Sequence, residues 1–168
     1  SVDVYEVVEV VKDTVKFDVE AREHTWVQDV PEGLPKVWVD YYRLLQVLIN
    51  LVTNAFKYTP DGGEIRLSVT KIGNNLVFTV SDTGVGLSPE QLEQLGTKFW
   101  RSHDDHARAQ PGTGLGFAIS QMIVEKMGST ITVESEKGKG STFSFAVPIA
   151  TSEHKVSGVV QVSSDSSK

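Results

Sequence analysis

The chain contains no cysteine, no long hydrophobic run and no excess of positive charge. The absence of cysteine excludes disulfides and thiolate metal sites. No apolar run approaches the roughly 18 residues needed to span a bilayer, and no signal-peptide pattern opens the chain. The net charge of −6 argues against a nucleic-acid surface, but it does not exclude a nucleotide ligand. We therefore expect a cytoplasmic domain without nucleic-acid or membrane contacts of its own, whether or not the full-length protein is anchored in a membrane.

The length of 168 residues suits one domain with a real core and a tail. We expect the domain to cover residues 1–150. Residues 151–168 hold six serines and little that could pack, so we interpret them as a flexible tail or linker. The chain begins without an initiator Met, and we expect it to be a piece of a longer protein.

Helices and mostly antiparallel strands are predicted to follow one another along the domain. Apolar residues at helical spacing predict helices over about 3–16, 41–57 and 115–127, with a short one after Pro89. Alternating patterns predict an antiparallel pair in "EIRLSVTK" and "LVFTVSD", and a hairpin in "STITVES" and "STFSFAVPI". "HTWVQDV" and "KVWVD" also have the pattern of short strands. Together these elements predict a two-layer α/β sandwich, with helices packed on one face of a mixed, mostly antiparallel sheet.

The helix expected over 41–57 carries an unusual polar stripe. At about 100° per residue, Asn54 lies about 40° from Asn50, and Lys57 about 20° to the other side. The apolar residues form a separate stripe, made of Leu44, Leu48, Leu51, Val52 and Ala55. A solvated face is the usual reason for polar residues on a helix, but Asn is a poor helix former and is uncommon there.

A carboxylate follows directly from the end of an expected strand, in "SDTGVGL". Asp82 continues the alternation of Leu76, Phe78 and Val80, so it should point toward the helices. A buried carboxylate needs a partner, and an amino group of a bound ligand would serve. Gly84 and Gly86 allow the backbone to bend sharply or to approach something flat. A turn with an Asx hydrogen bond is the structural alternative.

A glycine-rich loop runs into the third long helix, in "PGTGLGFAISQMIVEKMG". Backbone N–H groups and the positive helix end can form an anion site there, although such a loop is commonly structural. It matches neither the Walker pattern nor the dinucleotide-binding glycine spacing. The long stretch before it, residues 96–111, mixes charges with Phe99 and Arg101, and we interpret it as part of a flexible lid. We expect residues of about 88–112 to gain order with ligand.

Four of these segments together are far more specific than any one alone. "NLVTNAFKYT", "DTGVGL", "FWR" and "GTGLGF" occur in this order. They resemble the N, G1, F and G2 boxes of the ATP-binding catalytic domain of sensor histidine kinases. That family shares the Bergerat fold with DNA gyrase, the heat-shock chaperone ATPases and MutL. The resemblance spans roughly residues 2–149.

The resemblance implies that the polar stripe faces Mg²⁺-ATP. Asn54 would be the principal Mg²⁺ ligand with help from Asn50, because an amide oxygen suffices when the phosphates bring the charge. Lys57 would approach the phosphates, and Tyr58 would line the pocket.

The resemblance also implies which residues bind the adenine base and which belong to the lid. Asp82 would accept a hydrogen bond from the adenine amino group, with Thr142 near it through water. Gly84 and Gly86 would shape the base site. The lid and the phosphate loop would contribute Phe99, Arg101, Gly112, Thr113, Gly114, Leu115 and Gly116, with Arg101 in a catalytic role alongside Asn54 and Lys57.

The residue one turn before Asn54 separates the branches of the superfamily. The hydrolytic branches carry a glutamate there to activate water, whereas this chain carries Asn50, whose amide cannot accept a proton. The resemblance therefore favours a kinase over an ATPase. Phosphoryl transfer needs positioning and charge neutralisation more than covalent help.

None of the four histidines lies in the family's His-Glu/Asp phosphoacceptor motif. The resemblance thus implies that a histidine-bearing dimerisation domain is the partner, with a response regulator downstream, and that the isolated domain is monomeric. An anti-sigma-factor type of serine kinase is the alternative, and an ATP-binding signalling module of a degenerate kinase is a third possibility.

Overall fold

The computed structural model describes residues 1–94 and 115–151 and contains a five-stranded mixed sheet. Its strands are β1 (Thr25–Asp29), β2 (Glu64–Ile72), β3 (Asn75–Asp82), β4 (Thr132–Glu136) and β5 (Gly140–Pro148). Their order across the sheet is β1-β2-β3-β5-β4. β1 pairs with β2 in parallel, and the other three pairs are antiparallel. The predicted antiparallel pair and the predicted hairpin are both confirmed.

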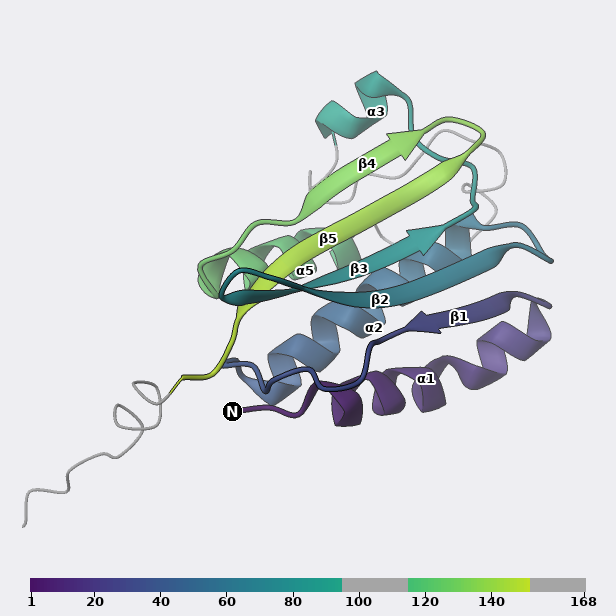
Figure 1. Ribbon diagram of the computed structural model, residues 1–168. Helices are drawn as coiled ribbons and strands as arrows, with labels where there is room; N and C mark the ends of the chain where they lie inside the picture. Colours follow the sequence, from purple (N-terminus) through teal and green to yellow (C-terminus); the bar gives the residue numbers. More distant parts are fainter. Residues whose placement is uncertain (95–114, 152–168) are drawn as a thin grey trace, which may run out of the picture.

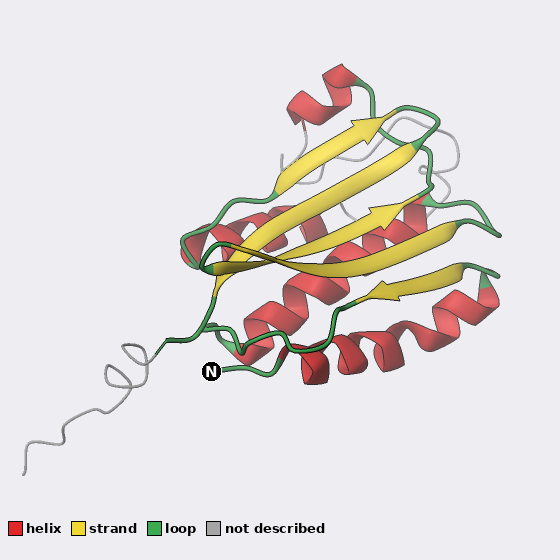
Figure 2. Cartoon of the chain, in the orientation of Figure 1, coloured by secondary structure: helices red, strands yellow, loops and turns green. Residues whose placement is uncertain are grey.

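Three long helices cover one face of the sheet, α1 (Val4–Ala21), α2 (Tyr41–Tyr58) and α5 (Leu115–Lys126) (Figure 1). α2 lies between α1 and α5 and contacts both of them. The short helix α3 (Pro89–Gln94) lies beside β4 (Figure 2). The two-layer sandwich predicted from the sequence is therefore confirmed. In the part of the chain that the structure describes, no helix is long and apolar enough to cross a membrane.

The central helix α2 begins and ends for different reasons. At its start, the side chain of Asp40 accepts a hydrogen bond from the backbone N–H of Arg43, which caps the helix. At its end, Thr59 adopts an extended conformation, as expected for a residue that precedes a proline. The buried face of α2 is the apolar stripe that the sequence predicted, formed by Leu44, Val47, Leu48, Leu51, Val52, Ala55 and Phe56.

The two faces of the sheet differ in chemistry because side chains alternate along each strand. The face under the helices is apolar, with Ile65, Leu67, Val69, Leu76, Phe78 and Val80 all buried. The opposite face carries pairs of hydroxyls across neighbouring strands. Thr79 pairs with Ser144 at 3.1 Å between their oxygens, and Ser81 pairs with Thr142 at 3.2 Å.

Two expected boundaries differ from the structure. The first helix continues to Ala21 instead of ending near residue 16, because its last turn is mostly exposed and gave no apolar periodicity. "KVWVD" is not a strand. Val37 forms only isolated bridges, to Val2 and to Ile149, before the chain enters α2. The expected tail covers residues 151–168, and all of it except Thr151 lies outside the described residues.

Candidate functional site

The polar stripe of α2 is half-buried along its whole length. Asn50, Asn54, Lys57 and Tyr58 are each partly shielded, in contrast to the fully buried apolar stripe of the same helix. A purely solvated face would leave long side chains such as that of Lys57 more exposed. The two amides follow one another at one helical turn, so both side chains lie on the same side of α2. Two neutral oxygen ligands suit Mg²⁺ when an anionic ligand brings the remaining charge.

Asp82 occupies the last position of β3, on the face of the sheet that the helices cover. It lies opposite Ile65 of β2 and Ser141 of β5. One carboxylate oxygen accepts a hydrogen bond of 2.8 Å from the N–H of Gly84, and the N–H of Ser141 also donates to the carboxylate. Burial nevertheless raises the pKa of Asp82 to about 6, and these two backbone donors offset only part of that rise.

Among the described residues, no cation forms an ion pair with Asp82. The two backbone N–H groups therefore do not use all the hydrogen bonds that the carboxylate can accept. The structure confirms that Asp82 points toward the helices. The Asx hydrogen bond to Gly84, which the sequence left open as an alternative, is present as well. The two interpretations are compatible, because a carboxylate that accepts from two backbone N–H groups still has lone pairs that can accept from a ligand.

The two glycines after Asp82 are needed for close backbone packing. A Cβ on Gly84 would overlap the backbone oxygen of Tyr58 and would crowd the Asp82 carboxylate. Gly86 has a φ of 68°, and a Cβ there would overlap the backbone oxygen of Glu136, the last residue of β4. The loop that follows Asp82 is thus pressed against the C-terminal end of α2 on one side and against the β4–β5 turn on the other.

The register of the sheet corrects one predicted site residue. Thr142 lies opposite Ser81 and bonds to its hydroxyl, so its side chain is on the open face, away from Asp82. Ser141, one residue earlier, is the direct partner of Asp82 and is 8% exposed. Because side chains alternate along a strand, an error of one residue changes the face. We therefore replace Thr142 by Ser141 as the hydroxyl beside Asp82.

Thr59 is a second residue that sequence reasoning missed. Its side chain is fully buried at the end of α2, and its hydroxyl has no hydrogen-bond partner in the described part of the chain. That hydroxyl lies against Gly84, next to the Asp82 carboxylate. The sequence offered only its position directly after Tyr58, and nothing in the pattern indicated burial.

The helix that follows the glycine-rich loop begins near Asp82. Phe117, in the first turn of α5, packs against Phe143 of β5 with ring centroids 5.7 Å apart, and Phe143 lies opposite Val80 of β3. Leu115 and Gly116 are the first residues of α5. The remaining predicted residues lie outside the described part of the chain, together with most of the predicted lid, and they are Phe99, Arg101, Gly112, Thr113 and Gly114.

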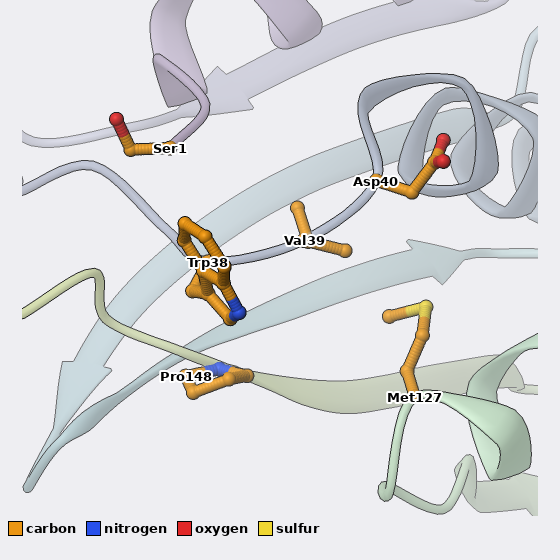
Figure 3. Close-up of a pocket in the computed structure, with 6 residues that line it drawn as sticks. All are labelled: Ser1, Trp38, Val39, Asp40, Met127 and Pro148. Carbon is orange, nitrogen blue, oxygen red and sulfur yellow. The ribbon is translucent and has the colours of Figure 1, made fainter. Parts of the chain in front are cut away.

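A pocket with a volume of about 400 Å³ lies at the opposite end of the sheet from Asp82. Figure 3 shows Trp38 beside Pro148, with Met127 approaching from the end of α5 and Asp40 at the start of α2. None of the predicted site residues lines this pocket. The candidate site therefore rests on the arrangement of α2, Asp82 and the start of α5.

The comparisons with known proteins identify the family of this fold. The family described as histidine kinase-, DNA gyrase B-, and HSP90-like ATPase matches residues 39–151. Sensor histidine kinase RppB of Synechocystis sp. is 39% identical over 121 residues, which are 72% of this chain and 27% of the relative. The adaptive-response sensory kinase SasA of Thermosynechococcus vestitus is 40% identical over 136 residues, which are 80% of this chain and 35% of that protein.

A solved structure of full-length ShkA in complex with AMPPNP has a similar fold, with a TM-score of 0.78 and 30% identity. The similarity covers 89% of this chain and 31% of that one. This chain thus spans about a third or less of the length of these proteins. With the family match covering more than half of its residues, the chain belongs to the histidine kinase-, DNA gyrase B- and HSP90-like ATPase family, and its named relatives here are sensor kinases.

Proposed function

We propose that this chain binds Mg²⁺-ATP and donates the γ-phosphate to a histidine on a separate phosphoacceptor domain. The main observation behind the proposal is that the polar side of α2 and the loop after Asp82 lie next to each other. The half-buried amide stripe of α2 ends where the loop after Asp82 packs against Tyr58. The relatives named as sensor kinases and the nucleotide-bound ShkA structure support the same conclusion.

In this proposal the base of the nucleotide lies against the loop after Asp82. The adenine amino group donates to the Asp82 carboxylate, whose burial and lack of a cation partner among the described residues favour a neutral donor. Ser141 is the hydroxyl on the same face and can hold a bridging water. Gly84 and Gly86 keep the loop flat, and Tyr58 lines the base site.

The phosphates lie along the amide stripe in this proposal. Asn54, with Asn50 one turn before it, would hold Mg²⁺, which supplies charge neutralisation for the phosphates when bound. Lys57, half-buried at the same side of α2, places a cation beside them. Arg101 and the loop of Gly112, Thr113 and Gly114 stay predictions for the lid and the γ-phosphate, as does Phe99.

The amide of Asn50 is the reason for proposing transfer instead of hydrolysis. It cannot take a proton from water at neutral pH, so this domain has no general base at that position. The acceptor must be supplied by another domain, because none of the four histidines is in a phosphoacceptor motif. A response regulator would then receive the phosphoryl group.

The test incubates the chain with γ-labelled ATP, alone and with a separately prepared histidine-bearing phosphoacceptor domain. We expect no labelling of the chain itself and little phosphate release. We expect acid-labile, base-stable label on the acceptor domain, and Asn54→Ala should abolish it. Tyr42→Ala, in the exposed first turn of the same helix, is the control and should leave transfer intact. Brisk phosphate release by the chain alone would indicate an ATPase, and base-labile label on a serine would indicate a serine kinase of the anti-sigma type.

A further inference from the structure

The C-terminal end of α2 lacks the usual local means of satisfying its backbone carbonyls. The last carbonyls of a helix have no partner within the helix, and a glycine just after the end commonly supplies the turn that satisfies them. Here Thr59 is extended and Pro60 follows, so that turn is not formed. The carbonyls at this end therefore need donors from other parts of the fold or from water.

Two residues at the junction between α1 and β1 supply donors. A guanidinium N–H of Arg22 donates to the backbone oxygen of Phe56 at 2.7 Å. The Nε2 of His24 lies 3.0 Å from the backbone oxygen of Thr59 and 3.1 Å from that of Pro60. Since both neighbours are carbonyls, Nε2 must carry the proton.

His24 is held firmly in this position. It is 7% exposed, and its ring stacks on Phe56 of α2 with an interplanar angle of 8°. Its Nδ1 is buried and has no hydrogen-bond partner in the described part of the chain. An apolar side chain would fill this space without leaving a buried nitrogen unpaired, so the feature that histidine adds is the donation from Nε2.

The same end of α2 holds the loop that follows Asp82. The N–H of Val85 donates to the backbone oxygen of Tyr58 at 3.0 Å. Gly84 packs against that oxygen and the Thr59 hydroxyl so closely that no side chain fits. A shift of Thr59 therefore moves the contact surface of the Asp82 loop. Figure 1 shows the α1–β1 junction and the C-terminal end of α2 at the same end of the molecule.

We propose that Arg22 and His24 are positioning residues for the nucleotide site. They bracket Lys57 and Tyr58, because Arg22 binds the carbonyl of Phe56 before them and His24 binds the carbonyl of Thr59 after them. By fixing this turn, they keep Lys57 and Tyr58 in register with Asp82. Both residues lie outside residues 39–151, the part that matches the family. The expected effect of these two residues on ATP binding rests on the proposed function. Their expected effect on the position of the loop after Asp82 does not depend on it.

The test compares His24→Leu with His24→Gln. Leucine fills similar space without a donor, whereas the amide nitrogen of glutamine can reach the position of Nε2. In the absence of nucleotide, we expect His24→Leu to speed hydrogen exchange at the Val85 amide by about tenfold relative to that at Leu67, in the middle of β2. We expect the same variant to weaken ATP binding by about three- to tenfold, and His24→Gln to stay within about twofold of the wild type in both measurements.

Val11→Ala is the matched control, because Val11 is buried on α1 about three helical turns before Arg22. It should lower global stability without a selective change at Val85 or in ATP affinity. If His24→Leu does not fold, Arg22→Met removes the other donor and should speed exchange at Val85 by about threefold.

Unchanged exchange at Val85 in these variants would overturn the inference, as would a His24→Gln variant that behaves like His24→Leu. Failure of the wild type to bind ATP would instead overturn the proposed function. The exchange measurement would then still decide whether Arg22 and His24 position the loop.

Discussion

The two ends of α2 are stabilised in opposite ways. At the N-terminal end, the side chain of Asp40 accepts from the N–H of Arg43, three residues away, at 3.1 Å. At the C-terminal end, the donors are Arg22 and His24, which lie 34 to 36 residues from the carbonyls that they bind. The first end is specified by its own sequence, and the second depends on the rest of the fold. The candidate site lies at the second end.

This contrast implies that changes near the C-terminal end should affect stability and nucleotide binding together. Changes at the N-terminal end should affect stability alone. The distance between the two ends makes this separation testable, because α2 has 18 residues and each residue adds about 1.5 Å along the helix.

The largest effect is expected for Gly84→Ala. The new methyl group would overlap the backbone oxygen of Tyr58, so the Asp82 loop must move away from α2. We expect a loss of about 3 kcal/mol or more in the free energy of unfolding, together with loss of measurable ATP binding. Denaturant unfolding and calorimetry measure the two effects.

Gly73→Ala is the control for Gly84→Ala. Gly73 has a φ of 59° in the β2–β3 turn, with open space where its Cβ would be. It should cost about 1 kcal/mol through backbone conformation and leave ATP binding unchanged. Equal effects of the two substitutions would contradict the close packing described at Gly84.

The second effect concerns the dependence of stability on pH. Burial raises the pKa of Asp82 to about 6 in the folded state, from its ordinary value of 3.8. Between these values the folded state binds more protons than the unfolded state, so stability falls as pH rises through this window. Removal of the charge in Asp82→Asn should therefore stabilise the protein above pH 6, by about 3 kcal/mol at most, and the difference should shrink toward pH 4. Thermal unfolding across pH 4–8 measures this, and a stability gap that widens on acidification would show the opposite sign.

The smallest effect is expected at the N-terminal end of α2. Asp40→Ala removes the side-chain cap and should cost about 1 kcal/mol of unfolding free energy. ATP affinity should remain within about twofold of the wild type, because the site is at the other end. Asp40→Asn, which retains a capping oxygen, should recover most of the stability. A loss of ATP affinity in Asp40→Ala would remove the distinction between the two ends.

The same contrast explains how much of the fold the sequence could predict. The start of α2 at Tyr41 and the alternation of β2 and β3 depend on residues close in sequence, and both were predicted correctly. The orientation of Asp82 followed from the parity of β3 alone. The stripe of Asn50, Asn54 and Lys57 likewise needed only the helical period.

The parts that the sequence could not predict depend on contacts between distant segments. The choice between Ser141 and Thr142 requires the register of β5 against β3, which no local pattern supplies. The burial of Thr59 and the role of His24 require the α1–β1 junction to be placed against α2. The segment "KVWVD" has a strand-like sequence, but in the structure its Val37 forms only single bridges, to Val2 and to Ile149.

The central claim is that Asp82 recognises the base of a nucleotide bound along α2. Calorimetry with ATP and GTP in the presence of Mg²⁺ tests this claim most directly. The account predicts that the wild type binds ATP in preference to GTP, because the adenine amino group donates to the carboxylate and guanine presents an acceptor at that position. Asp82→Asn should weaken ATP binding by about 1–3 kcal/mol and reduce the preference. Equal binding of ATP and GTP by the wild type, or unchanged ATP binding by Asp82→Asn, would contradict the account.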